Sequence, residues 1–581
     1  MNNQDTRKFL FWLLLGILCV TLLPFLGLND FHTKGEPREA VVSYSMIHTG
    51  NWILPENAGG DMAYKPPFFH WCIALASLPG GEITEYTSRI PSAVALIMMA
   101  CAFFLFFSKR TDVWKSFLAT LIFVSSFEVH RAGMNSRVDM VLTAMIVMAT
   151  LQLYRWWENG FKGVPIWAIL FMSFGTLTKG PVGFILPCAS CGLFLLLSKV
   201  PFWKAFWKMA LAGVLSCILP AIWYYFAYLQ GGQEFIDLVM EENFGRFLGK
   251  MSYRSHENPV YYNFITMIAG YIPWTILMVF ALFTINYRNI REHSRGLWSR
   301  IKNWFLTADR ARVFALVSAL LIFVFYCIPK SKRSVYLLPV YPFIALFIAD
   351  LFVWLINNKP KVWRVFGWLI ASLTSLLLIL FGLIKTGLIQ PDSFLSGKSA
   401  AKMTQYVVEM QNASIGFIGF VSIVVALAFL INFFKVLRTK QWNIRFMGAV
   451  IALVFGLQIL LDGVLQPAIL NHKSIKKFAH EVEEIVPEGV IYGYIPVEMM
   501  RFYIINFYIG NRVHLFDVEQ PDNGYLLSGE RTFRDIIEPE YGSKYTFEPV
   551  IRTPHNDTEI KDYIWLYRFD KKQSQSLDNE E

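Results

Sequence analysis

The chain has 581 residues, of which 55% are apolar and only 17% are charged, and its formal net charge is +10. Soluble proteins carry about 25% charged residues, so this composition excludes a string of ordinary soluble domains, and its high hydrophobicity excludes intrinsic disorder. The abundance of Phe (51) and Trp (18) in long apolar runs indicates a polytopic α-helical membrane protein.

Charge-poor runs long enough to cross a bilayer, or nearly so, recur along the first 466 residues and predict about 13 transmembrane helices. The first run follows Arg7-Lys8 and has no small-residue cleavage site, so it is interpreted as an anchor. The predicted spans are 9–28, 90–108, 114–131, 138–157, 164–179, 180–198, 206–230, 260–286, 312–329, 334–356, 364–384, 413–434 and 445–465.

One shorter apolar stretch, 68–78, follows two prolines and is predicted to be a re-entrant or interfacial helix. If it does not span and the N-terminus is cytoplasmic, the basic clusters at 109–110, 287–311 and 435–440 all fall in inner loops. That is the excess of Lys and Arg expected for cytoplasmic loops. Residues 29–89 and everything after 466 are then on the outer face.

Residues 467–581 form a second predicted domain, small and of α/β class, with a disordered tail. This segment has a net charge of −7, whereas residues 1–466, the predicted transmembrane catalytic domain with its outer first loop 29–89, have +17. Helices are predicted at 475–486 and 497–509, and strands at 489–495, 512–516, 525–528, 546–551 and 563–569.

The outer first loop carries the first candidate site residues. After Gly35, residues 36–46 are predicted to form a short helix with Glu36 and Arg38 in its first turn. Farther along, the pair Pro66-Pro67 fixes an extended backbone, so that Lys65 is held in place. Tyr64 and Arg38 are expected to support this loop.

Other outer-face segments add charges directly against apolar helix ends. Any one of these charged side chains could simply extend toward the membrane–water interface. A set of charged residues that come from separate segments on one face instead predicts a shared polar cavity. The cations suit an anionic group such as phosphate at the membrane surface, and Glu36 and Asp139 could act as a general base or orient an acceptor. These further residues are Asp139, Lys179, Arg246, Lys330, Lys332 and Arg333, with Tyr336 beside them.

The order of these motifs, from the first-loop acidic-x-Arg through GNWILP, KPP, TKG and EENFGRF, resembles the aminoarabinose transferases of lipid A. Those enzymes belong with the protein O-mannosyltransferases to the membrane glycosyltransferase class called GT-C. The resemblance covers residues 9–345. It implies an inner-membrane enzyme of bacteria that uses a sugar linked to undecaprenyl phosphate or a similar polyprenyl phosphate. The acceptor would be a lipid A-like lipid or a protein on the periplasmic face, where the C-terminal domain would also lie.

The resemblance also implies residue roles. Asp139 would belong to the catalytic cavity. This chain departs from the family at Gly35, where an aspartate usually precedes the glutamate, so either Glu36 or Asp139 would be the base and the acceptor stays open. The residues that would hold the donor phosphate are Lys65, Lys179, Arg246, Lys330, Lys332, Arg333 and Tyr336.

Two other function classes compete with a glycosyltransferase. A transporter or flippase of polyprenyl lipids would more often show paired repeats and broken helices near the midplane. A non-catalytic scaffold would leave Glu36, Arg38 and Lys65 unexplained. No metal site is predicted, no cofactor is required although a divalent cation could bind, and no nucleic-acid partner is expected.

Overall fold

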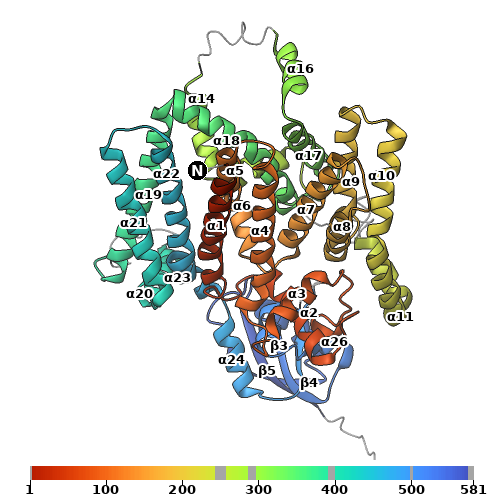
Figure 1. Cartoon of the computed structure of the whole chain (residues 1–581). Helices are drawn as coiled ribbons and strands as arrows, with labels where there is room; N and C mark the ends of the chain where they lie inside the picture. The colour runs from red at the N-terminus through yellow and green to blue at the C-terminus, as the bar shows by residue number, and fades with distance from the viewer. Residues whose placement is uncertain (1–2, 243–256, 286–295, 390–399, 497–500, 573–581) are drawn as a thin grey trace, which may run out of the picture. The chain divides into compact units, whose positions relative to one another are not determined.

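The computed structural model describes the whole chain except residues 1–2, 243–256, 286–295, 390–399, 497–500 and 573–581 (Figure 1). It divides into two compact units. The helical unit comprises Met1–Leu26, Tyr64–Phe69 and Arg89–Leu465, and the sheet unit comprises Gly27–Ala63, His70–Ser88 and Gln466–Glu581.

The helical unit is built from long apolar helices joined by short connections. Its first half contains α1 (Asn3–Leu22), α4 (Glu85–Phe107), α5 (Val113–Val124), α6 (Phe127–Gly133), α7 (Val138–Glu158), α8 (Ile166–Lys179), α9 (Val182–Leu197), α10 (Phe202–Ser216) and α11 (Ile218–Met240). Its second half contains α13 (Tyr261–Gly270), α14 (Trp274–Leu282), α16 (Leu297–Thr307), α17 (Arg310–Cys327), the 3₁₀ turn η5 (Ser334–Val340), α18 (Tyr341–Asn358), α19 (Pro360–Lys385), α20 (Ala400–Asn412), α21 (Phe417–Arg438), α22 (Ile444–Leu460) and the π turn η7 (Leu461–Leu465).

The predicted class, a polytopic α-helical membrane protein with a small C-terminal sheet domain, is confirmed. Within the described residues nine helices are long and apolar enough to span, or ten if α13 and α14, bent by 104°, count as one. The prediction of about 13 spans is not confirmed. Three of the predicted runs form shorter helices, α5, α8 and α9. The run 114–131 breaks at Ser125, whose carbonyl accepts a hydrogen bond from Gln458 and whose hydroxyl accepts one from Trp274 Nε1.

Helix α7 lies at the centre of the helical unit. It is buried along most of its length and packs against α8 and α9, while α9 also packs against α10 and α17. Aromatic residues such as Tyr154, Phe194 and Phe314 fill the space between α7, α9 and α17. A second group, α19, α21 and α22, lies side by side (Figure 1). Because α7 is packed on all sides, the residue at its N-terminal end is held in a fixed place.

The sheet unit combines part of the first loop with the C-terminal segment. Its helices include α2 (Gly35–Thr49), most of α3 (Phe68–Ser77), α23 (Gln466–Leu470), α24 (Lys476–Ile485), α25 (Tyr503–Tyr508), α26 (Phe516–Glu519), α27 (Glu530–Thr532) and α28 (Glu538–Tyr541). Its five strands are β1 (Ile491–Tyr494), β2 (Val513–Leu515), β3 (Asn523–Gly529), β4 (Tyr545–Arg552) and β5 (Ile564–Lys571), in the order β2-β1-β3-β5-β4. Strand β1 is parallel to β2 and β3, and β5 is antiparallel to β3 and β4.

The predicted strands and the helix at 475–486 are confirmed in this unit. The helix predicted at 497–509 is shorter, because Phe502 adopts a left-handed conformation (φ 50°) and α25 begins only after it; residues 497–500 lie outside the described residues. Alternate strand residues face opposite sides of the sheet. Leu527 and Leu566 face the core under α24 and α25, whereas Leu526 and Tyr567 face an aromatic cluster on the other side.

An ion-pair network joins the first loop to the C-terminal segment inside the sheet unit. Lys476 Nζ lies 2.8 Å from Glu85 Oε1 and 3.2 Å from Asp30 Oδ1. Burial acts to lower the pKa of Lys476, but its hydrogen bond to Glu85 and the charges of Glu85 and Asp30 outweigh burial and raise it. Phe31 and Tyr503 share an apolar cluster with Ala40 of α2. The first loop is therefore an integral part of this unit.

Candidate functional site

Asp139 and Lys179 form an ion pair in the helical unit. Asp139 lies in the first turn of α7 with its side chain buried, and Lys179 is the last residue of α8. Gly180 then adopts a positive φ of 78°, which ends the helix in a turn that suits glycine. Lys179 Nζ lies 2.5 Å from Asp139 Oδ1, and the lysine side chain remains 27% exposed. The pair therefore presents a partly accessible cation at a helix end.

An aromatic ring and further cations surround this pair. Lys179 Nζ lies 4.5 Å from the ring centroid of Tyr336 in η5, within the range of a cation–π contact. Tyr336 in turn stacks on Tyr326 at 5.5 Å. The charges of Arg333 and Arg137 also act on the Asp139 carboxylate. Helices α7 and α8 and the segment 333–336 thus converge on one cationic cluster.

The loop before η5 is held by hydrogen bonds to its backbone carbonyls. The backbone N–H of Asn258 donates a hydrogen bond to the Lys330 carbonyl (3.2 Å), and its side-chain amide donates one to the Lys332 carbonyl (3.1 Å). Lys332 is buried and its Nζ donates to the Pro329 carbonyl at 2.5 Å, whereas the Lys330 side chain is exposed. Arg246 lies outside the described residues, so its predicted role stays a prediction.

In the sheet unit, α2 carries a second buried polar cluster. Glu36 lies in the first turn of α2 and is 3% exposed. Arg38 Nη2 donates to Glu39 Oε1 at 2.8 Å, and the other oxygen of Glu39 lies 2.8 Å from His70 Nε2 of α3. Burial raises the pKa of Tyr503 to about 12, while the charge of Arg38 acts in the opposite direction.

The structure therefore brings together a subset of the predicted residues. Asp139, Lys179, Arg333 and Tyr336 meet in the helical unit, which also contains the half-buried Tyr64 and Lys65. Glu36 and Arg38 belong to the sheet unit.

Sequence reasoning missed two buried pairs. One is Glu39 with His70, and the other is His130 with Asp462, 2.6 Å apart in the helical unit. In each case the sequence feature that could have indicated the pair is an ionisable residue within an apolar stretch. Among the residues that the structure describes, no three His, Cys, Asp or Glu side chains are grouped closely enough to hold a metal ion.

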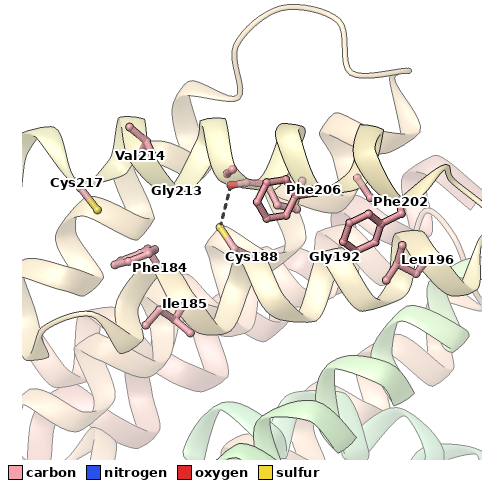
Figure 2. A pocket seen from close by; sticks show the side chains of 13 residues that line it. Phe184, Ile185, Cys188, Gly192, Leu196, Phe202, Phe206, Gly213, Val214 and Cys217 are labelled. Carbon is pink, nitrogen blue, oxygen red and sulfur yellow. Dashed lines mark hydrogen bonds between the residues drawn. The ribbon is translucent and has the colours of Figure 1, made fainter. Parts of the chain in front are cut away.

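An apolar groove runs between α9 and α10, shown in Figure 2. It has a volume of about 520 Å³, and its lining is almost entirely carbon and sulfur. Phe184, Cys188 and Leu196 of α9 face Phe206, Gly213 and Cys217 on or beside α10. Helix α9 begins three residues after Lys179, so at about 1.5 Å per residue the groove starts within a helical turn or two of the ion pair.

Comparisons with known proteins extend these observations. Residues 64–224 match the family described as dolichyl-phosphate-mannose-protein mannosyltransferase. A protein of Aquifex aeolicus is 28% identical over 384 residues, which are 64% of this chain and 70% of that protein. The undecaprenyl phosphate-α-4-amino-4-deoxy-L-arabinose arabinosyl transferase of Shewanella sediminis is 25% identical over 368 residues. That match spans 60% of each chain.

The fold has a solved counterpart. The crystal structure of ArnT from Cupriavidus metallidurans bound to undecaprenyl phosphate superposes with a TM-score of 0.69 over 96% of this chain and 97% of that chain. The two sequences are 16% identical, so this likeness concerns the fold. The sequence matches and the fold together confirm the predicted resemblance to GT-C proteins.

Proposed function

We propose that this chain is an integral-membrane glycosyltransferase. It transfers a sugar from a polyprenyl-phosphate-linked donor to a lipid A-like lipid or to a protein, on the periplasmic face of a bacterial inner membrane. The observation that carries the proposal is the pair of cations Lys179 and Arg333, with the Tyr336 ring beside Lys179, at the ends of apolar helices. The fold shared with ArnT and the matches to an arabinosyl transferase and to the mannosyltransferase family support it.

The chemistry of such a transfer requires a leaving phosphate to be stabilised. The acceptor oxygen attacks the anomeric carbon, the bond from that carbon to the phosphate oxygen breaks, and polyprenyl phosphate departs as an anion. Cations that are already in place lower the barrier because no reorganisation is needed when the charge develops. Lys179, fixed between a carboxylate and an aromatic ring but still partly exposed, is suited to this task.

The position of Asp139 bears on the choice of base. One of its oxygens already accepts the hydrogen bond of Lys179. A carboxylate engaged in this way is better suited to hold the lysine than to take a proton from an acceptor. We therefore assign Asp139 to positioning Lys179, and of the two residues that the sequence suggests as a base this leaves Glu36.

The lipid chain of the donor has a suitable place in the apolar groove between α9 and α10. A polyprenyl tail has no polar groups, and this groove presents almost no polar surface (Figure 2). Its nearness along the chain to Lys179 would let one lipid place its phosphate at the cation and its tail in the groove.

The proposal is tested with the purified full-length chain in detergent, supplied with polyprenyl-phosphate sugars and lipid A extracted from its own host. We expect release of polyprenyl phosphate and a matching mass increase of the acceptor. Glu36→Gln and Lys65→Ala should each abolish both, whereas the exposed residues changed in Glu56→Gln and Lys162→Ala should keep wild-type activity. A flippase would produce neither product, because detergent leaves no two compartments to connect.

The acceptor class is identified by mass spectrometry of lipid A and of envelope glycoproteins in a deletion strain. A sugar missing from one of them and restored by the wild-type gene, but not by the Glu36→Gln gene, is the expected result. Full activity of both Glu36→Gln and Lys65→Ala would refute the proposed site.

A further inference from the structure

A second pocket, of about 540 Å³, lies on one face of the sheet in the sheet unit. Strands β4 and β5 provide its floor, and α27, the π turn Phe533–Ile537 and α28 provide its wall. It lies beside the edge of the sheet, because β4 is the outermost strand. The lining residues that matter here are Glu530, Phe533, Glu538, Phe547, Trp565 and Tyr567.

Five aromatic residues line the pocket, and four of them, Phe533, Phe547, Trp565 and Tyr567, carry the argument here. Phe533 stacks on Tyr567 with centroids 4.0 Å apart and planes at 11°. Phe547 meets Phe533 edge-on at 5.4 Å, and Trp565 lies 6.1 Å from Tyr567. Phe533, Phe547 and Trp565 are only half-buried, although apolar rings gain free energy from full burial. Concave apolar surface with a few polar groups is typical of small-molecule sites.

Two carboxylates form the polar part. Glu530 accepts a hydrogen bond from Trp565 Nε1 at 3.2 Å, which places its charge beside the indole ring. Glu538 lies at the start of α28, and its side chain is exposed. No Lys, Arg or His is among the residues that line this pocket in the described part of the chain. Burial, followed by the charges of Glu530, Glu538 and Asp562, raises the pKa of Tyr567. The lining of the pocket is therefore aromatic and carries two carboxylates. Outside the lining, the guanidinium carbon of Arg552 lies 5.5 Å from the centroid of the Trp565 ring.

We propose that this pocket binds a sugar that carries a protonated amine. An ammonium group is attracted both by carboxylates and by the faces of aromatic rings. The apolar face of a sugar ring can lie flat on Trp565, while its hydroxyl groups donate hydrogen bonds to Glu530 and Glu538. Ring stacking alone would suit any sugar, and the two carboxylates, in a lining that includes no cationic side chain, are what favour the amino sugar. This inference does not depend on the function proposed above.

The test measures binding of glucosamine to the full chain in nanodiscs by saturation-transfer NMR titration at pH 6, where the amine is protonated and the carboxylates are ionised. We expect glucosamine to bind at least tenfold more tightly than glucose or N-acetylglucosamine. Equal binding of glucose would overturn the role of the amine. Ethanolamine binding as tightly as glucosamine would overturn the assignment to a sugar.

Variants locate the site. Glu538→Gln and Trp565→Ala should each weaken glucosamine binding at least tenfold. The matched control is Glu548→Gln, which removes the same charge from the residue after Phe547, on the opposite face of β4. If Trp565→Ala does not fold, Glu538→Gln decides the test alone, because its exposed side chain is not part of the core. Unchanged affinity in Glu538→Gln, or an equal loss in Glu548→Gln, would refute the site.

Discussion

At the scale of single residues, substitutions in the Asp139–Lys179 pair should affect stability and activity differently. Removing one member of a buried ion pair leaves the other charge uncompensated, at a cost of about 3–5 kcal/mol. Lys179→Ala should therefore lower the melting temperature and reduce the transfer rate at least a hundredfold. Adding Asp139→Asn to this variant should restore much of the melting temperature, because no unpaired carboxylate remains, but should not restore transfer.

Thermal melts and transfer rates of the two single variants and the double variant check this prediction. Asp139→Asn alone should retain more activity than Lys179→Ala, since Lys179 keeps its contact with the Tyr336 ring. If the double variant lost activity by the product of the two single losses, the residues would act independently, and Asp139 would have a role beyond positioning the lysine.

At the scale of elements, two glycines allow the helices that flank Lys179 to touch. A Cβ on Gly183 of α9 would lie 2.3 Å from the backbone of Gly175 and Thr176 in α8. Small residues of this kind let helix backbones approach closely in membranes. Gly183→Ala should force α8 and α9 apart, lower stability by about 1–3 kcal/mol, and reduce transfer because the turn that holds Lys179 moves with them.

Gly192→Ala is the matched control for this substitution, since it lies on the same helix and its Cβ would meet only Met209 Cγ at 3.7 Å, an ordinary contact. Melting temperatures of the two variants in the same detergent should differ by several degrees. Equal melting temperatures would show that α8 and α9 accommodate the methyl group without moving.

The same elements show what the sequence could and could not predict. Asp139 and Lys179 could be placed together because both lie at the outer ends of adjacent predicted helices. The contact of Lys179 with Tyr336 could not, because it depends on a 3₁₀ turn after a distant helix and on side-chain direction. The Glu39–His70 pair requires α2 to meet α3 across an irregular return of 18 residues, 50–67, which no periodicity describes. Hydropathy found the run 114–131 but not the polar contacts that break it at Ser125.

At the scale of the whole molecule, charge is divided between the two parts of the chain, with +17 in residues 1–466 and −7 in residues 467–581. Basic residues favour cytoplasmic loops, so the excess in loops such as 287–311 predicts that these loops are inside and that the acidic C-terminal segment is periplasmic. The orientation matters because the helix ends that carry Lys179 and Arg333 can meet a periplasmic acceptor only if they lie on the outer face.

Cysteine labelling tests this orientation. All seven native cysteines lie at or before Cys327, and each is at least partly buried, so the wild-type chain gives a low background. Ser543→Cys, exposed in the sheet unit, should react with a membrane-impermeant maleimide in intact spheroplasts. Ser299→Cys, exposed in α16, should react only after lysis. The reverse pattern would place Lys179 and Arg333 on the cytoplasmic side, where the donor sugar would have to be used before it crosses the membrane.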